Sequence, residues 1–500
     1  MQLNLGDVLS KTANGSTNHR QRIGLVAGII LFLVLAFVPI PGVPVIIRRM
    51  MAVVSLMAIW WVSEAIPLAA TSLLPLVLFP FLGIASAGDA AAPYANHLIY
   101  LFLGGFMLAQ AMQRWDLHRR LALHIVALVG TSPSRVILGF MCASAFVSMW
   151  VSNTATTAMM MPIGLAVIQQ VGEAVREERT DIDLTPGKFH FGIDLMLGIA
   201  YAASIGGVGS LIGTPPNVLL AGTMEEVYGI QVSFLRWLAF GVPFVVAFIP
   251  LTWLWLTRVA YPLEISEVPG GTQLIKEHIR NLGPMSVGER RTAYLFALTA
   301  AAWMFRPLWT RLIPSGELIT DSTIAMTAAV TAFVLPAGSG ERVLNWKWAS
   351  KLPWDVLLLF GGGFSLAAGF ERSGLSRWVG EQLTHFSQAP LPLFILSIVV
   401  VIIILTEFAS NTASTAMSLP VLGATATAMG LSPLTLCIPA AVAASCAFMM
   451  PAATPPNAIV FGTGYLTIPQ MVRAGFFIVL IGALLITLYT FLIIRPLFGV

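Results

Sequence analysis

One stretch of the chain occurs twice, and this repetition limits what the chain can fold into. The string Ser-Asn-Thr-Ala stands at 152–155 and again at 410–413, 258 residues later. A Thr-Pro-Pro-Asn string follows in each copy, at 214–217 and at 454–457. Because two motifs recur in the same order, we interpret the chain as an internal duplication.

Composition places both copies in a membrane. Hydrophobic residues make up 57% of the 500 residues. Charged residues make up only 10%, against roughly 25% in soluble domains. Lys and Arg fall mainly between the apolar runs, so the net charge of +4 indicates membrane topology and not a nucleic-acid-binding face. The three cysteines, Cys142, Cys437 and Cys446, have neither the spacing of a metal site nor that of a disulfide framework.

Apolar runs of about 20 residues predict about eleven transmembrane helices. We place them at 23–40, 48–63, 66–83, 97–113, 192–223, 232–257, 291–307, 320–337, 354–370, 433–463 and 470–494. The organisation that follows is an N-terminal tail with the first helix (1–45), a first repeat (46–260), a cytoplasmic linker (261–290) and a second repeat (291–500).

The motif-bearing segments differ from ordinary membrane spans. Segments 134–171 and 391–430 are each nearly twice the length of one span and carry Ser-Asn-Thr near the middle. They predict two re-entrant helical hairpins with the motif at the tip, where non-helical backbone must lie within protein or beside a water-filled cavity. Thr-Pro-Pro-Asn interrupts the spans at 192–223 and 433–463. Because proline removes a helix donor, we expect both helices to be broken inside the membrane.

The predicted fold is an all-α polytopic membrane protein with inverted repeats. Each repeat has an odd number of crossings, so the second copy enters the membrane in the opposite sense. The basic segments 172–190 and 258–290 indicate the cytoplasmic side, although the arginine pair 48–49 goes against the rule. We expect a cytoplasmic N-terminus and a C-terminus outside. Segments 114–130 and 371–388 mix charged and apolar residues, which predicts interfacial amphipathic helices.

The motifs suit an anion together with small cations. Helix N-termini favour anions, while carbonyl and hydroxyl oxygens favour hard cations such as sodium. No Lys or Arg lies within 136–175, 195–235 or 378–472. An anion held there must therefore be neutralised by helix dipoles or by co-bound cations, which predicts sodium coupling.

Two further features have structural interpretations. The glycines around Gly104 and Gly362 precede the two Ser-Asn-Thr strings by 48 residues each, and we interpret them as helix-packing faces. Glu407 lies three residues before Ser410. Because a carboxylate inside a membrane segment is a functional candidate by default, we interpret Glu407 as a candidate support for the site.

Both motif pairs, together with Ser-Glu-Ala-Ile-Pro at 63–67, resemble the divalent anion/sodium symporter family, which carries dicarboxylates, citrate and, in some members, sulfate. The resemblance extends over almost the whole chain. It implies a homodimer of scaffold and transport domains that works by an elevator motion. The implied substrate-binding residues are Ser152, Asn153, Thr154, Thr214, Ser410, Asn411, Thr412, Thr454 and Pro455. The implied sodium sites are Ser148, Ser152, Asn153 and Gly213 for the first ion, and Thr406, Ala409, Asn411 and Ala453 for the second.

The expected function is sodium-coupled symport of C4-dicarboxylates (succinate, malate or fumarate) across the plasma membrane. The alternatives within transporters are a sodium-independent dicarboxylate or citrate exchanger and a sulfate carrier. A membrane-embedded enzyme would need a nucleophile–base pair or a metal cluster, and the motif regions contain no cluster of His, Asp and Glu. An ion channel would not need two hairpins related by inversion. The expected partners are substrate, sodium, lipid and a second copy of the chain, without nucleic acid.

Overall fold

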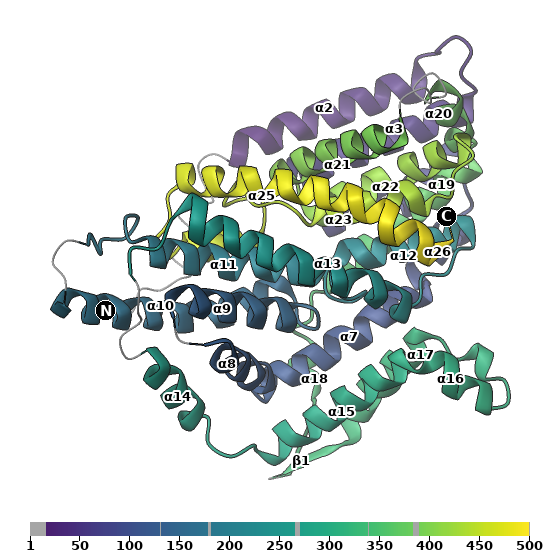
Figure 1. The fold of residues 1–500 in the computed structure, drawn as a ribbon. Helices are drawn as coiled ribbons and strands as arrows, with labels where there is room; N and C mark the ends of the chain where they lie inside the picture. Colours follow the sequence, from purple (N-terminus) through teal and green to yellow (C-terminus); the bar gives the residue numbers. More distant parts are fainter. Residues whose placement is uncertain are drawn as a thin grey trace.

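The computed structural model describes residues 17–130, 132–178, 182–265, 271–338, 340–383 and 390–499. These residues are mostly helical (Figure 1). The first half of the chain contains α2 (Thr17–Phe37), α3 (Val45–Ser63), α4 (Leu68–Thr71), α5 (Leu74–Leu82), α6 (Ala87–Ala91), the 3-10 turn η1 (Ala92–Ala95), α7 (His97–Arg114), α8 (Leu117–Val129), α9 (Pro133–Ser148), α10 (Asn153–Glu178), α11 (His190–Gly207), α12 (Pro215–Tyr228), α13 (Phe234–Trp255) and the π-helical turn η2 (Leu256–Ala260).

The second half contains one short strand pair among its helices. Its elements are α14 (Gly271–Asn281), α15 (Val287–Met304), α16 (Arg306–Trp309), the 3-10 turns η3 (Thr310–Leu312) and η4 (Gly316–Leu318), α17 (Asp321–Val334), β1 (Pro336–Gly338), β2 (Glu341–Arg342), α18 (Trp346–Ala349), α19 (Trp354–Arg372), α20 (Leu375–Leu383), α21 (Leu391–Phe408), α22 (Asn411–Ala428), α23 (Leu434–Ala444), α24 (Pro455–Phe461), α25 (Ile468–Tyr489), the π-helical turn η6 (Thr490–Ile494) and α26 (Arg495–Phe498). Strands β1 and β2 pair antiparallel.

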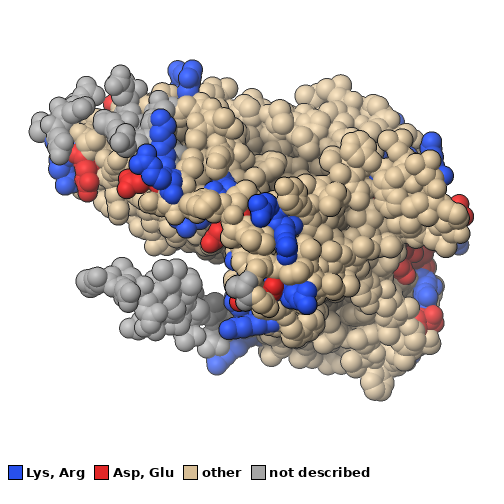
Figure 2. Space-filling model, turned by 90° about the horizontal axis from the view of Figure 1, so that it is seen from below, with Lys and Arg blue, Asp and Glu red and all other residues tan. Residues whose placement is uncertain are grey.

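Within the described residues, seven helical segments are long and apolar enough to cross a membrane. They are His19–Phe37, Val45–Ser63, Ala87–Arg114, Asn153–Arg176, Phe234–Ala260, Leu391–Phe408 and Ile468–Phe498. Shorter apolar helices lie at Leu68–Leu82, Pro133–Ser148, Asp321–Val334 and Leu434–Ala444. On the face shown in Figure 2, Lys, Arg, Asp and Glu gather in a few groups and leave wide uncharged areas between them. The chain is therefore a polytopic helical membrane protein.

Several predicted boundaries differ from the structure. The span predicted at 66–83 is divided into α4 and α5, and Pro75 lies in the first turn of α5. The span predicted at 320–337 ends at Val334, beyond which the chain enters β1. The segment 258–290, predicted as a loop, contains α14. The predicted interfacial helices at 114–130 and 371–388 correspond to α8 and α20, and residues 384–389 of the second lie outside the described residues.

The predicted interruptions lie at the motifs. The chain turns between α9 and α10 at 149–152, and between α21 and α22 at 409–410. It leaves the helix between α11 and α12 at 208–214, and between α23 and α24 at 445–454. The hairpin predicted at 134–171 is longer than expected, because α10 continues to Glu178. The same order of hairpin and broken helix therefore occurs in both copies.

Helix α11 lies at the centre of the packing. Every residue of α11 from Phe191 to Gly207 is buried, as expected for a helix that is apolar on all sides. It packs against α9, α10 and α13, and against α24 from the second copy. Helix α12 packs against α22 and α19, so the two copies are interleaved and do not form separate bodies (Figure 1).

The two glycine patches lie where helices approach closely. A Cβ on Gly104 would lie 2.6 Å from the Ala325 carbonyl carbon of α17. A Cβ on Gly362 would lie 2.3 Å from the Ser72 carbonyl oxygen, which follows α4. Any side chain at these positions would push the helices apart, which agrees with the interpretation as packing faces.

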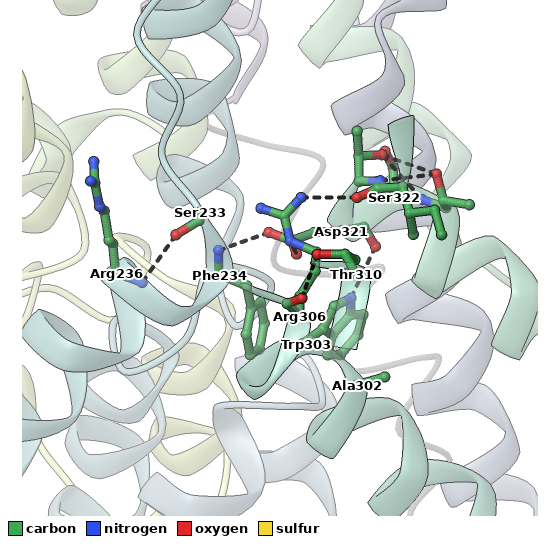
Figure 3. Close-up of polar contacts among 12 residues, drawn as sticks. Ser233, Phe234, Arg236, Ala302, Trp303, Arg306, Thr310, Asp321 and Ser322 are labelled. Carbon is green, nitrogen blue, oxygen red and sulfur yellow. Dashed lines mark hydrogen bonds and ion pairs between the residues drawn. The ribbon is translucent and has the colours of Figure 1, made fainter. Parts of the chain in front are cut away.

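An ion pair within the second copy is also hydrogen-bonded to the first copy (Figure 3). The Asp321 carboxylate at the start of α17 pairs with Arg306 Nε at 2.8 Å. It also accepts the backbone N–H of Phe234, the first residue of α13, at 2.9 Å. The Trp303 indole N–H donates to the Asp321 carbonyl at 2.9 Å. Because Asp321 is almost fully buried, Arg306 and the Phe234 N–H are needed to stabilise the charge of its carboxylate.

Candidate substrate and cation site

The four motif strings lie at helix N-termini. Helix α10 begins at Asn153 and α22 at Asn411, while α12 begins at Pro215 and α24 at Pro455, each directly after a threonine. The first N–H groups of a helix have no intrahelical acceptor and carry partial positive charge. Helix α10 packs against α24, and α12 packs against α22. Each of these N-termini favours an anionic ligand.

The predicted substrate residues range from exposed to buried, while the residues predicted for the cation sites alone are all buried. Ser152, Thr154 and Pro455 are exposed, Asn153, Ser410, Asn411 and Thr412 are half-buried, and Thr214 and Thr454 are buried. The other residues assigned to the cation sites, which are Ser148, Gly213, Thr406, Ala409 and Ala453, are all buried. The Ser-Asn-Thr strings are therefore less buried than the residues assigned to the cation sites alone.

The first copy brings most of its predicted cation residues together around Gly207. Ser148 Oγ donates to Asn153 Oδ1 at 2.7 Å. A Cβ on Gly207 would lie 2.5 Å from the same Oδ1, and a Cβ on Gly213 would lie 2.4 Å from the Gly207 carbonyl oxygen. Ser152 Oγ accepts the Ala155 N–H at 3.3 Å. Side-chain and main-chain oxygens therefore converge here, which is the donor set that a small hard cation needs.

The second copy repeats one of these contacts and adds another. Thr406 Oγ1 is within hydrogen-bonding distance of Asn411 Oδ1 at 2.7 Å and of the Ala444 carbonyl oxygen at 2.9 Å. Thr406 precedes Asn411 by five residues, as Ser148 precedes Asn153. Ala453 donates its N–H to Met450 O at 3.2 Å, and the contacts among the described residues do not join it directly to Asn411. The ligand roles of both sets stay predictions.

Sequence reasoning missed the last residue of each Thr-Pro-Pro-Asn string as part of the site. Asn217 Nδ2 donates to the carbonyls of Gly207 at 3.0 Å and Ser210 at 2.7 Å. At the same offsets, Asn457 Nδ2 donates to Ala447 at 3.2 Å and Met450 at 3.0 Å. Each amide therefore ties the start of its helix to the loop before it, and in the first copy also to Gly207, the last residue of α11. The sequence signal was the recurrence of asparagine after the two prolines.

Glu407 stabilises the interruption between α23 and α24. Its Oε1 accepts the N–H groups of Phe448 at 2.7 Å and Met449 at 2.9 Å, and its Oε2 accepts that of Met450 at 3.1 Å. The Tyr201 hydroxyl of α11 donates to the Phe448 carbonyl at 2.8 Å. Three N–H donors satisfy a carboxylate that would otherwise be costly to bury.

The first copy achieves the same connection without a charge. Met149, at the position of Glu407, accepts a hydrogen bond through its carbonyl oxygen from Ser210 Oγ. In both copies, a hairpin tip is therefore bonded to the loop of the neighbouring broken helix.

The fold and the site together define a polytopic membrane transporter fold with polar groups at interrupted helices. The family model described as "Sodium:sulfate symporter transmembrane region" matches residues 19–500, so the chain belongs to this family. The chain is 40% identical over 500 aligned residues to the "Sodium-dependent dicarboxylate transporter SdcS" of Staphylococcus saprophyticus, covering 98% of this chain and 95% of that protein. A protein of the same name from Staphylococcus aureus is 41% identical, covering 96% and 92%.

Solved structures resemble the fold at low sequence identity. The Alcanivorax borkumensis YdaH transporter has a TM-score of 0.55 at 14% identity, covering 97% of this chain and 98% of that chain. Neisseria gonorrhoeae MtrF has a TM-score of 0.57 at 10% identity, covering 92% and 97%. These two likenesses concern the fold alone.

Proposed function

We propose that the chain is a sodium-coupled symporter of C4-dicarboxylates in the plasma membrane, and not an enzyme. The observation that carries this proposal is the identity of 40–41%, over nearly the whole length, to proteins named sodium-dependent dicarboxylate transporters. The site supports it because the Ser-Asn-Thr strings, which are exposed or half-buried and lie at helix N-termini, suit a carboxylate. The buried oxygens behind them suit sodium as a co-transported ion.

Charge balance gives the physical reason for coupling. The motif segments contain no Lys or Arg, so helix N-termini and bound sodium have to neutralise a dicarboxylate. Each ligand then lowers the free energy of binding the other, and this coupling is reciprocal. Uptake of the substrate against its gradient follows when sodium enters down its own gradient.

Replacement of sodium tests the coupling directly. Uptake of radiolabelled succinate into proteoliposomes should fall to background when potassium or choline replaces sodium, because the anion then lacks its countercharge. Equal uptake in all three salts would contradict symport and favour the sodium-independent exchanger. Proteoliposomes without protein give the background for each salt.

A sulfate carrier is the second candidate, because the family description names sulfate. Succinate and sulfate each carry two negative charges, but the two anions differ in length. Excess unlabelled succinate should abolish the uptake of labelled succinate, while the same concentration of sulfate should leave it nearly unchanged. Strong inhibition by sulfate together with weak inhibition by succinate would assign the site to sulfate.

We further propose that the two copies form an inverted repeat with a cytoplasmic N-terminus, and that a homodimer works by an elevator motion. The end of α10 and helix α20 lie at opposite ends of the molecule, which supports this orientation (Figure 1). In a variant without natural cysteines, Thr185→Cys should react with an impermeant maleimide from the cytoplasm. Arg377→Cys should react from outside, since both positions are exposed. Labelling of both from one side would contradict the inverted arrangement.

A substitution at Gly207 tests whether the position of Asn153 matters. The added methyl group of Gly207→Ala would overlap the Asn153 amide, so succinate uptake should fall at least about tenfold, a loss of about 1.4 kcal/mol. Gly172→Ala on α10 is the matched control, because nothing lies within 4 Å of the added Cβ. Normal uptake by Gly207→Ala would show that transport does not depend on the position of the Asn153 amide.

A further inference from the structure

An apolar groove lies between α3 and the second motif-bearing hairpin. Its volume of about 660 Å³ is within the range of roughly 300–1,000 Å³ that is typical of ligand sites. Its walls include Ala58 and Val62 of α3, Val401 and Leu405 of α21, and Met417 and Val421 of α22. The groove thus joins a helix of the N-terminal half to the hairpin that carries Ser410 at its tip.

The serine side chains that line the groove leave its surface apolar, because their hydroxyl groups are bonded within their own helices. Three serines line it, and each hydroxyl donates to a carbonyl of its own helix. Ser63 donates to Ile59 O at 2.6 Å, Ser397 to Phe394 O at 2.7 Å and Ser418 to Thr415 O at 3.2 Å. An occupant therefore meets an almost wholly apolar surface, and a hydrocarbon chain is the chemistry that fits it.

A positively charged side chain, that of Arg20, lies at one end of this groove. The Arg20 guanidinium of α2 donates to the Val62 carbonyl and, at 2.7 Å, to the Phe408 carbonyl. Val62 lines the groove, and Phe408 is the last residue of α21, three residues after the groove residue Leu405. The Arg20 side chain is exposed. A guanidinium presents five N–H donors in a planar fork, a geometry that suits phosphate oxygens.

We propose that the groove and Arg20 form a binding site for one anionic glycerophospholipid. One acyl chain occupies the groove between α3, α21 and α22, and the phosphate pairs with Arg20. Charge complementarity favours an anionic phospholipid, since basic residues near a membrane surface attract anionic lipids. Because Arg20 also contacts the carbonyl two residues before Ser410, bound lipid is placed beside the hairpin tip of the second copy.

Native mass spectrometry of the delipidated full-length protein tests the site. The probe is dioleoyl-phosphatidylglycerol, and its two halves are tested separately as dioleoylglycerol, which lacks the phosphate, and as glycerol 3-phosphate, which lacks the chains. We expect one phosphatidylglycerol bound at low lipid ratio and no comparable binding of either half. Binding of glycerol 3-phosphate alone at similar affinity would overturn the lipid assignment.

Paired variants locate the two halves of the site. Arg20→Gln should weaken binding about tenfold, because a charge-assisted hydrogen bond is lost, whereas Arg22→Gln on the same helix should not. Val401→Trp should fill the groove and exclude the chain. Ile404→Trp, on the same helix but outside the groove lining, is its control, since the two side chains are similarly exposed at 61% and 53%. Unchanged binding by both Arg20→Gln and Val401→Trp would refute the site, as would cysteine cross-links at position 401 that join two copies through this face.

Discussion

Asn153→Ala and Asn411→Ala are each expected to abolish succinate transport while the protein still folds. Each side chain offers a carbonyl oxygen for a cation and an NH₂ group for a carboxylate. The structure shows that the oxygens of Asn153 and Asn411 already face the hydroxyls of Ser148 and Thr406. Loss of the amide leaves buried polar groups unpaired at a cost of roughly 1–3 kcal/mol, or a factor of about 5–150 in affinity. Since the ligands are coupled, both affinities should fall together.

The aspartate variants separate the two halves of the amide. Asn153→Asp keeps an oxygen toward the cation but replaces the NH₂ group with a negative oxygen. We expect sodium binding to be retained and dicarboxylate binding to be lost, because the new charge repels the substrate. Thermal stabilisation of the purified variant by sodium alone, and by sodium with succinate, measures this difference.

A helix cap outside the motifs provides the control. Asn345 caps α18 by accepting the Trp348 N–H through Oδ1 at 3.2 Å, and it is exposed. Asn345→Ala should reduce stability slightly and leave both ligand affinities unchanged. If Asn153→Ala and Asn411→Ala behaved like Asn345→Ala, with normal sodium and succinate affinities, both residues would be helix caps and not ligands.

Glu407→Gln is expected to lower both stability and transport. The carboxylate accepts three consecutive N–H groups, and an amide nitrogen in place of one oxygen would face a donor with another donor. Loss of a hydrogen bond to a charged group costs about 1.5–3 kcal/mol. Glu407→Ala removes all three acceptor contacts and should cost more. Because the released loop leads directly to Ala453 and Thr454, sodium and substrate affinity should fall together with the melting temperature.

Comparison with an exposed carboxylate isolates this effect. Glu173 lies on α10 and is exposed, so Glu173→Gln should retain normal stability and uptake. Denaturation curves and uptake are measured on the same preparations. Wild-type uptake by a destabilised Glu407→Gln would mean that Glu407 supports the fold alone and leaves the geometry of the site unaffected.

The positions of the interruptions could be predicted from sequence because their causes are local. Proline cannot donate a helix hydrogen bond, so α12 and α24 begin at Pro215 and Pro455. The apolar runs likewise predicted most of the long helices. The predicted helix boundaries were less accurate where packing, and not hydropathy, determines the end of a helix. Val334, for example, is followed by a strand, and the continuation of α10 to Glu178 lies in a charged segment.

The amino-acid sequence predicted a membrane protein with helix breaks at two recurring pairs of motifs, because hydropathy and proline act within one segment. The groups that satisfy the freed backbone atoms depend on the tertiary structure. Asn217 and Asn457 bind carbonyls across the breaks, and Glu407 binds N–H groups more than 40 residues further along the chain. Local sequence shows where a helix loses its hydrogen bonds. Because a buried polar group requires some partner but not a particular one, its actual partner depends on which distant elements pack beside it.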